Sequence, residues 1–295
     1  MNINEFNSYQ IAQLDYWKEI STPYSIDTLK RVYPYHKFLD LDVKDCNIVA
    51  FLSHDIDFSP ERHLFVKANF TDRAKEHIGI YSLDDIQKII DLEKEYGLKS
   101  TIFSPVFNSK FTRFTSNLSK ILDSRFELGL HASPRCSSDA ERLIYEKKLI
   151  EKNTGRDVDS CRIHRLEYHY QKTIDSLKKA GFLYDSTFGY NNTIGFRGGI
   201  SHIFMPYKKN VIEIPLTIMD MTLWKYLRLS PTNSLKLIQE LINRATQNGG
   251  IITLNWHSDY ASYDEFFTVF RKTIEFLIRK DARFITINQI KEFLG

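Results

Sequence analysis

Apolar runs alternate with amphipathic stretches along the chain after about residue 45. The clearest apolar run is 47–53 (NIVAFLS), whose lack of polar alternation predicts a strand buried on both faces. Helical spacing follows, with Ser82 as N-cap, three isoleucines as the apolar stripe and Gly97 as the stop. A strand followed by such a helix predicts a β/α unit.

The same alternation continues to the C-terminal end. Further strands are predicted at 100–103, 126–130, 162–164, 182–185, 211–216 and 251–256, and further helices at 139–152, 172–180 and 234–248, before a last helix and strand. No internal repeat or Pro/Gly-rich linker interrupts the pattern. We therefore expect one α/β domain over residues 1–295, with residues 1–45 as an N-terminal extension packed on it.

Composition and charge narrow the class of protein. The 295 residues are 42% hydrophobic and 26% charged, which is typical of a globular protein with a sizeable core. Forty basic and 37 acidic residues give a net charge of +3 without a basic stripe, so nucleic acid is not an expected partner. No window reaches the roughly 20 apolar residues of a membrane span. Nothing in the pattern indicates an oligomeric state.

The first residues and the cysteines suggest a location. Residues 1–17 lack the basic start and apolar run of a signal peptide. Cys46, Cys136 and Cys161 are odd in number and irregularly spaced, which favours reduced thiols over disulfides. We therefore expect a cytoplasmic protein.

Titratable side chains follow several of the predicted strands. In α/β barrels the working groups lie at the C-terminal ends of the strands, because those ends converge on one face. The groups placed there are the acids of HDID (54–57), His131, His164, Asp185 and His257. We expect all of them on one rim.

Asp55 and Asp57 are separated by one residue, so in an extended chain both carboxylates point to the same side. One could bind a divalent cation while the other stays available as a base. The alternative is structural: Asp57 begins a turn with the following Phe-Ser-Pro, and Asp55 is a cap. His54 should point the opposite way and have a structural role.

His131 and His257 each follow an apolar strand. A lone histidine in such a place is usually a hydrogen-bonded structural residue. Two of them together with an Asp-x-Asp, at equivalent strand ends, form a typical ligand set for a divalent ion such as Zn²⁺.

Five ordered pieces resemble the polysaccharide deacetylase family, the NodB-like carbohydrate esterases. They are FLSHDID (51–57), YGLKSTIF (96–103), FELGLHAS (126–133), CRIHR (161–165) and LNWHSD (254–259), and the likeness spans roughly 49–257. Residues 184–199 and 212–220 resemble a branch of that family found with surface-polysaccharide genes. The resemblance implies a distorted (β/α) barrel of about seven parallel strands. It also implies a metal-dependent N-deacetylase that acts on an amino sugar in surface-polysaccharide biosynthesis.

By this resemblance Asp55 takes the general-base position and His257 the general-acid position, while Asp57 and His131 are metal ligands. Arg162 matches the arginine that begins the family's third motif. The chemistry is consistent with these roles. Hydrolysis of an amide needs an activated water, a stabilised oxyanion and a proton for the departing amine, and a metal, a carboxylate and an imidazolium supply them.

One position departs from the family pattern. The family has a further histidine ligand four residues after the first, where this chain has Arg135, and a guanidinium cannot bind a metal. His164 is the nearest replacement ligand, and His169 a more distant one. Two alternatives stay open: hydrolysis of another linear or cyclic amide on the same barrel, and a catalytically inactive relative that binds glycan.

Substrate-binding residues are less strongly indicated. Trp256 adjoins His257 and is a candidate for stacking on a sugar ring. Arg197 lies in a glycine-rich loop and is a candidate for contacting an anionic substrate group. Asp185 is a third candidate at a strand end, and either Asp185 or Asp220 could support the catalytic histidine.

Overall fold

The computed structural model describes residues 19–39, 41, 46–56, 83–106 and 109–294. Asp57, one of the predicted metal ligands, lies outside the described residues. Within the described ranges, no helix has the length and apolar character needed to cross a membrane.

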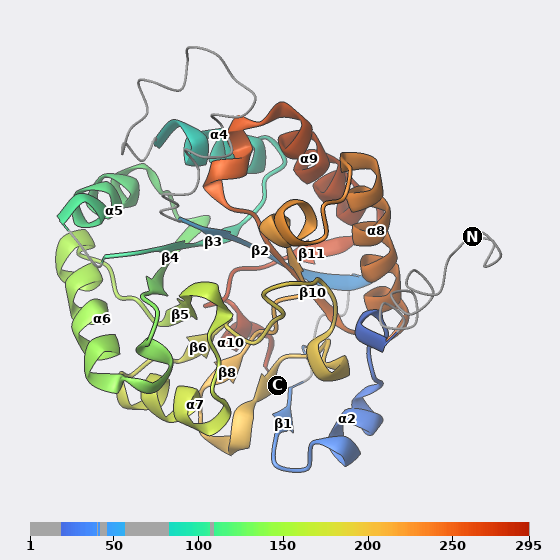
Figure 1. Ribbon diagram of the computed structural model, residues 1–295, viewed down its shortest axis with the longest axis horizontal. Coiled ribbons are helices and arrows are strands. Elements are labelled where there is room, and N and C mark those ends of the chain that lie inside the picture. The colour runs from blue at the N-terminus through green and yellow to red at the C-terminus, as the bar shows by residue number, and fades with distance from the viewer. Residues whose placement is uncertain (1–18, 40, 42–45, 57–82, 107–108, 295) are drawn as a thin grey trace.

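A central sheet is surrounded by helices (Figure 1). The strands are β1 (Lys37–Phe38), β2 (Ile48–Asp55), β3 (Ser100–Ser104), β4 (Phe126–Ala132), β5 (Ser160–Ile163), β6 (Tyr184–Asp185), β7 (Phe204–Met205), β8 (Ile212–Glu213), β9 (Ile218–Met219), β10 (Ile251–Asn255) and β11 (Ala282–Phe284). The helices are α2 (Ile26–Val32), α4 (Leu83–Glu95), α5 (Ser109–Ile121), α6 (Ala140–Thr154), α7 (Tyr170–Lys179), α8 (Pro231–Gln247), α9 (Asp264–Arg279) and α10 (Ile290–Phe293).

Eight parallel strands form a curled row in the order β8-β6-β5-β4-β3-β2-β10-β9, and β11 pairs parallel with β2 outside this row. β8 and β9 lie on one short segment, residues 212–219, which pairs with β6 through its first residues and with β10 through its last. The two ends of the row are therefore joined through this segment. Seven positions result when β8 and β9 are taken as one, so the distorted barrel of about seven parallel strands is confirmed.

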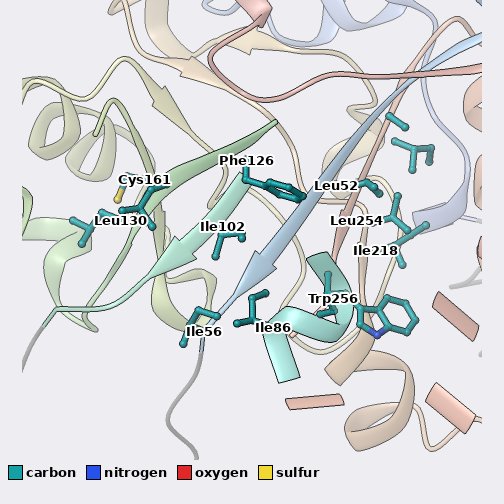
Figure 2. Packing of buried hydrophobic residues seen from close by; sticks show 14 of the residues in the cluster. Leu52, Ile56, Ile86, Ile102, Phe126, Leu130, Cys161, Ile218, Leu254 and Trp256 are labelled. Carbon is teal, nitrogen blue, oxygen red and sulfur yellow. The ribbon is translucent and has the colours of Figure 1, made fainter. Parts of the chain in front are cut away.

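Two layers of apolar side chains hold the barrel together. One fills the space between the strands and the helices, and Figure 2 shows members such as Leu52, Ile102 and Leu130 from neighbouring strands. The other lies inside the strands and includes Phe51 and Phe103. Because side chains alternate along a strand, residues of β2 point in turn to the helices and to the interior. This alternation places Asp55 toward the interior and His54 toward the helices.

The predicted strand at 211–216 is interrupted in the structure. β8 ends at Glu213 and β9 begins at Ile218, with Pro215 between them. Proline has no backbone N–H to donate to a ladder, so regular pairing stops there. The interruption allows one segment to pair with two different strands and so to connect the ends of the row.

Several parts of the described fold, α10 among them, were not predicted as elements. α5 follows β3, and β1 pairs antiparallel with β7 beside α2. Five of the thirteen residues of α5 are serine or threonine, which have modest helix propensity, and this weakens its sequence signal.

Candidate active site

Asp55 is the last residue of β2 and is almost completely buried. Arg162 Nη1 donates to its Oδ1 over 2.8 Å, and Asn255 Nδ2 donates to its Oδ2 over 2.6 Å. The Asp55 backbone N–H donates in turn to Asn255 Oδ1 over 3.1 Å. The charge of the carboxylate is thus neutralised by a guanidinium, and its orientation is fixed through both oxygens.

Arg162 projects from β5 and is fully buried. Besides its bond to Asp55 on β2, it donates from Nε to the Ser186 carbonyl over 3.0 Å and from Nη2 to Ser186 Oγ over 2.9 Å. Its guanidinium carbon lies 4.4 Å from the centre of the Phe103 ring on β3. The Arg162 side chain therefore crosses the barrel interior over β3. It connects β5 with the end of β2.

Gly129 on β4 makes room for this crossing. A Cβ atom at Gly129 would lie 2.6 Å from Cδ1 of Phe103 and 2.7 Å from Ser160 Oγ, which is closer than real Cβ contacts. The Phe103 ring therefore occupies the space over Gly129, and Arg162 rests on that ring.

His257 follows β10 and binds Asp220 through two atoms. Its backbone N–H donates to Asp220 Oδ2 over 2.7 Å, and its Nδ1 lies 2.5 Å from Asp220 Oδ1. Burial raises the pKa of the Asp220 carboxyl, while the charge of His257 and the hydrogen bonds from it act in the opposite direction. With Nδ1 bound to the carboxylate, Nε2 is the nitrogen directed to other partners.

His131 on β4 and His164, which directly follows the neighbouring strand β5, bring two imidazoles together. Their ring centres are 5.1 Å apart, and the His131 Nδ1 lies 3.0 Å from the Arg162 carbonyl. A carbonyl only accepts hydrogen bonds, so Nδ1 carries the proton, and in the neutral ring the lone pair is on Nε2. Metal-binding histidines commonly use their second nitrogen in this way.

The two imidazoles therefore fit part of a metal site. Within the part of the chain that the structure describes, no group of three or more His, Cys, Asp or Glu side chains could hold a metal ion. The third predicted donor, Asp57, lies outside that part.

Arg135, at the departure from the family pattern, is exposed and has a left-handed backbone with φ of 78°. Its backbone N–H donates to Glu167 Oε2 over 3.1 Å, and Glu167 Oε1 lies 2.9 Å from His169 Nε2. The bond to Glu167 thus ties the loop after β4 to the segment that follows β5.

Two predicted substrate-binding residues have no surface for a substrate here. Trp256 is fully buried, with its ring against Phe270 and Trp224 in the layer between strands and helices. Asp185 is also fully buried. Arg197 is partly exposed, and its guanidinium lies 4.7 Å from the Phe188 ring and donates to the Gly189 carbonyl.

Asp185 pairs instead with Glu213 on the neighbouring strand β8, at the same register. Burial, followed by the negative charge of Asp185, raises the pKa of Glu213 well above its usual range. Burial also raises the pKa of Asp185, which the hydrogen bonds from Glu213 and Thr187 oppose. Burial beside a second carboxyl therefore favours the protonated form of Glu213.

Three supporting residues escaped full prediction from the sequence. Asp220 was one of two candidates for supporting His257, and the contacts single it out. Asn255 was missed, although its position two residues before His257 puts it on the same side of the strand. Ser186 was also missed, because nothing in the local sequence indicates that a serine accepts hydrogen bonds from a distant arginine.

The comparisons with known proteins give a consistent architecture. No protein-family model matches the sequence, and no curated protein matches it at a significant level. A solved structure from Mycobacterium smegmatis that carries the name polysaccharide deacetylase superposes with a TM-score of 0.61 at 15% identity, covering 88% of this chain and 94% of the other. The fold is that of the polysaccharide deacetylases.

Two more solved structures align over similar lengths with lower scores. One is a family 4 carbohydrate esterase from Streptomyces lividans in complex with acetate (TM-score 0.49, 11% identity, 85% of this chain and 97% of that chain). The other is the peptidoglycan deacetylase PdaC from Bacillus subtilis (TM-score 0.47, 16% identity, 85% and 93%).

Proposed function

We propose that this protein is a hydrolase that removes the acetyl group from an N-acetylated amino sugar. The observation that carries the proposal is the pair of anchored groups at the ends of adjacent strands. Asp55 at the end of β2 is held by Arg162 and Asn255, and His257 after β10 is held by Asp220. An oriented carboxylate and an oriented imidazole are the base and acid that amide hydrolysis requires.

Each group has a defined task in this scheme. Asp55 accepts a proton from the water that attacks the acetyl carbon, since each of its oxygens retains lone-pair capacity beyond the bonds to Arg162 and Asn255. His257, protonated on Nε2 and backed by Asp220, donates that proton to the departing nitrogen. Arg162 keeps the carboxylate oriented while its protonation changes.

A divalent ion, most simply Zn²⁺, belongs to this proposal as a cofactor. His131 and His164 would hold it together with Asp57, and when bound it would supply Lewis acidity toward the water and the acyl oxygen. Exposed Arg135 does not replace the missing histidine, because a guanidinium has no lone pair to donate. We therefore propose His164, which directly follows β5, as the third ligand.

We place the substrate in the assembly of a surface polysaccharide on the resemblance of residues 184–199 and 212–220. We place the protein in the cytoplasm because Cys46, Cys136 and Cys161 are irregularly spaced free thiols. Arg197, at the edge of this region and partly exposed, is the residue we propose for contact with an anionic group of the substrate.

The test is acetate release from a panel of N-acetylated amino sugars presented free, nucleotide-linked, lipid-linked and as oligosaccharides. Wild type should release acetate from at least one class, and Asp55→Asn should not. Asp175→Asn is the matched control, because it neutralises an exposed carboxylate on α7 that pairs with Lys209. Release of another acyl group would support the alternative amide hydrolase. Glycan binding without any hydrolysis by wild type would support the inactive relative.

A further inference from the structure

His54 is a buried histidine that the proposed reaction does not use. It adjoins Asp55 on β2 but faces the helices, where its ring meets Phe270 of α9 edge-on at 5.7 Å. Its Nδ1 lies 2.9 Å from the Trp256 carbonyl, and its Nε2 lies 3.0 Å from Glu93 Oε1 on α4. Glu93 Oε2 accepts from Ser100 Oγ over 2.7 Å. This chain of contacts is buried throughout.

The donor at one end of the chain is fixed by chemistry. The Trp256 carbonyl can only accept, so the proton of that contact is on His54 Nδ1. Nε2 is then held by its 3.0 Å contact with Glu93 Oε1. The ring is therefore held in one orientation, with its Nδ1–H directed at the backbone of the neighbouring strand.

The Trp256 carbonyl lies where the ladder between β2 and β10 ends. The last registered pair is Ser53 with Asn255, and the Trp256 N–H donates to the Ser53 carbonyl over 2.9 Å. Beyond this point side chains join the strand ends. The Asn255 side chain accepts a hydrogen bond from the Asp55 N–H, and the His54 ring donates one to the Trp256 carbonyl.

That carbonyl belongs to the same planar peptide unit as the N–H of His257. The N–H donates to Asp220 Oδ2 over 2.7 Å, while the oxygen accepts from His54. In a trans peptide these two groups point in opposite directions, so hydrogen bonds hold the Trp256–His257 peptide plane on both sides. These two hydrogen bonds fix the position of the His257 Cα, and this position determines the direction of the imidazole.

We propose that His54 is a positioning residue for His257. Its Nδ1–H holds the Trp256–His257 peptide against Asp220, and Glu93 holds the ring that does so. The effect of this role on catalysis rests on the proposed function, whereas the hydrogen bonds that hold the Trp256–His257 peptide are a property of the structure.

Two substitutions separate the ends of the contact chain. Asn carries its amide nitrogen on Cγ as histidine carries Nδ1, so His54→Asn keeps a donor for the Trp256 carbonyl and loses Glu93. Gln carries its nitrogen one bond further, as histidine carries Nε2, so His54→Gln keeps Glu93 and loses the carbonyl. Each variant gives up one buried hydrogen bond, and thermal unfolding of both measures the purely structural loss.

We expect His54→Gln to lower kcat by roughly 10- to 100-fold with little change in KM, as misplacement of a catalytic group does. His54→Asn should retain most of the turnover. Proton NMR of nitrogen-labelled histidine should show the His257 Nδ1–H resonance shifted or broadened in His54→Gln and preserved in His54→Asn.

Equal kcat in the two variants, or equal losses that follow their stability, would overturn the positioning role. An unchanged His257 resonance in His54→Gln would do the same without any activity measurement. If wild type hydrolyses no amide, the proposed function fails, and the NMR comparison still decides whether His54 holds His257.

Discussion

Asp220 determines which nitrogen of His257 can exchange a proton with a substrate. Because Nδ1 lies 2.5 Å from Asp220 Oδ1, only Nε2 is in a position to act as the acid. An amine leaves as an unstable anion unless it is protonated, whereas the leaving group of an activated ester departs without help. The two kinds of substrate therefore depend on His257 to different extents.

We predict that His257→Ala lowers turnover of an N-acetylated sugar by about 10²- to 10⁴-fold and that of an activated acetate ester much less. Asp220→Asn should show a smaller difference between the losses on amide and ester, since it removes the carboxylate charge but leaves the His257 imidazole in place. Initial rates on both substrates measure the gap, with metal content checked alongside. Equal losses on amide and ester, with metal retained, would show that His257 does not act as the acid.

His164 is the proposed third ligand of the divalent ion. His164→Ala should weaken divalent metal affinity at least roughly tenfold, because even residues that only support a ligand typically contribute ~10- to 100-fold. Arg135→Ala should leave affinity unchanged. Titration with Zn²⁺ in a competing chelator measures both. Full affinity in His164→Ala would place the third ligand on another residue.

Residue-level expectations succeeded where chemistry and strand periodicity coincide. Asp55, His131 and His257 were placed at strand ends from apolar runs alone, and the structure has them there. Trp256 was selected by its neighbour in sequence, but adjacent residues on an extended segment face opposite sides. The bond from Arg162 to Asp55 joins residues 107 positions apart, and no local pattern reports such a pairing.

At the scale of elements, the space over Gly129 on β4 determines how Arg162 can cross the barrel interior. A methyl group there would overlap the Phe103 ring that supports the guanidinium. We predict that Gly129→Ala lowers stability by about 1–3 kcal/mol, the usual cost of overpacking, and lowers kcat as well. Phe103→Leu in the same chain should recover part of the stability by vacating the space. Urea unfolding of both single variants and the double variant measures this coupling.

If the stability losses in that cycle simply add, Gly129 and Phe103 do not compete for one space, and the account of the crossing is wrong. Recovered stability without recovered turnover is the expected pattern, since leucine offers the guanidinium no aromatic face.

Long elements with a clear period could be predicted, and short or interrupted ones could not. α6, α8 and β10 were anticipated within about three residues of their observed ends. Residues 212–219 pair first with β6 and then with β10 on either side of Pro215. This pairing is tertiary, so the apolar run in the sequence gives no sign of it. α5 was missed because serine and threonine dilute its apolar stripe.

For the whole molecule, the buried pair of Asp185 and Glu213 should make stability depend on pH. Glu213 keeps its proton in the folded state at pH values where the unfolded chain releases it. This contribution is therefore complete below the ordinary carboxyl pKa and is lost as the pH rises through the raised pKa. One such proton changes stability by up to about 1.4 kcal/mol per pH unit.

We predict that Glu213→Gln flattens this dependence above about pH 5, because an amide can donate to Asp185 without a titrating proton. Asp175→Asn, which alters only an exposed pair, should keep the wild-type slope. Urea unfolding at a series of pH values gives both slopes. A Glu213→Gln slope identical to that of wild type would mean that the pair does not hold the proton.

The central claim is that Asp55 activates a water whose oxygen enters the released acetate while His257 protonates the amine. Its most direct test is hydrolysis of an N-acetylated amino sugar in water labelled with heavy oxygen, followed by mass spectrometry of the acetate and of the sugar. We expect one labelled oxygen in each acetate, an unlabelled free amine, and loss of both products in Asp55→Asn but not in Asp175→Asn. Acetate without label, or full turnover by Asp55→Asn, would contradict it.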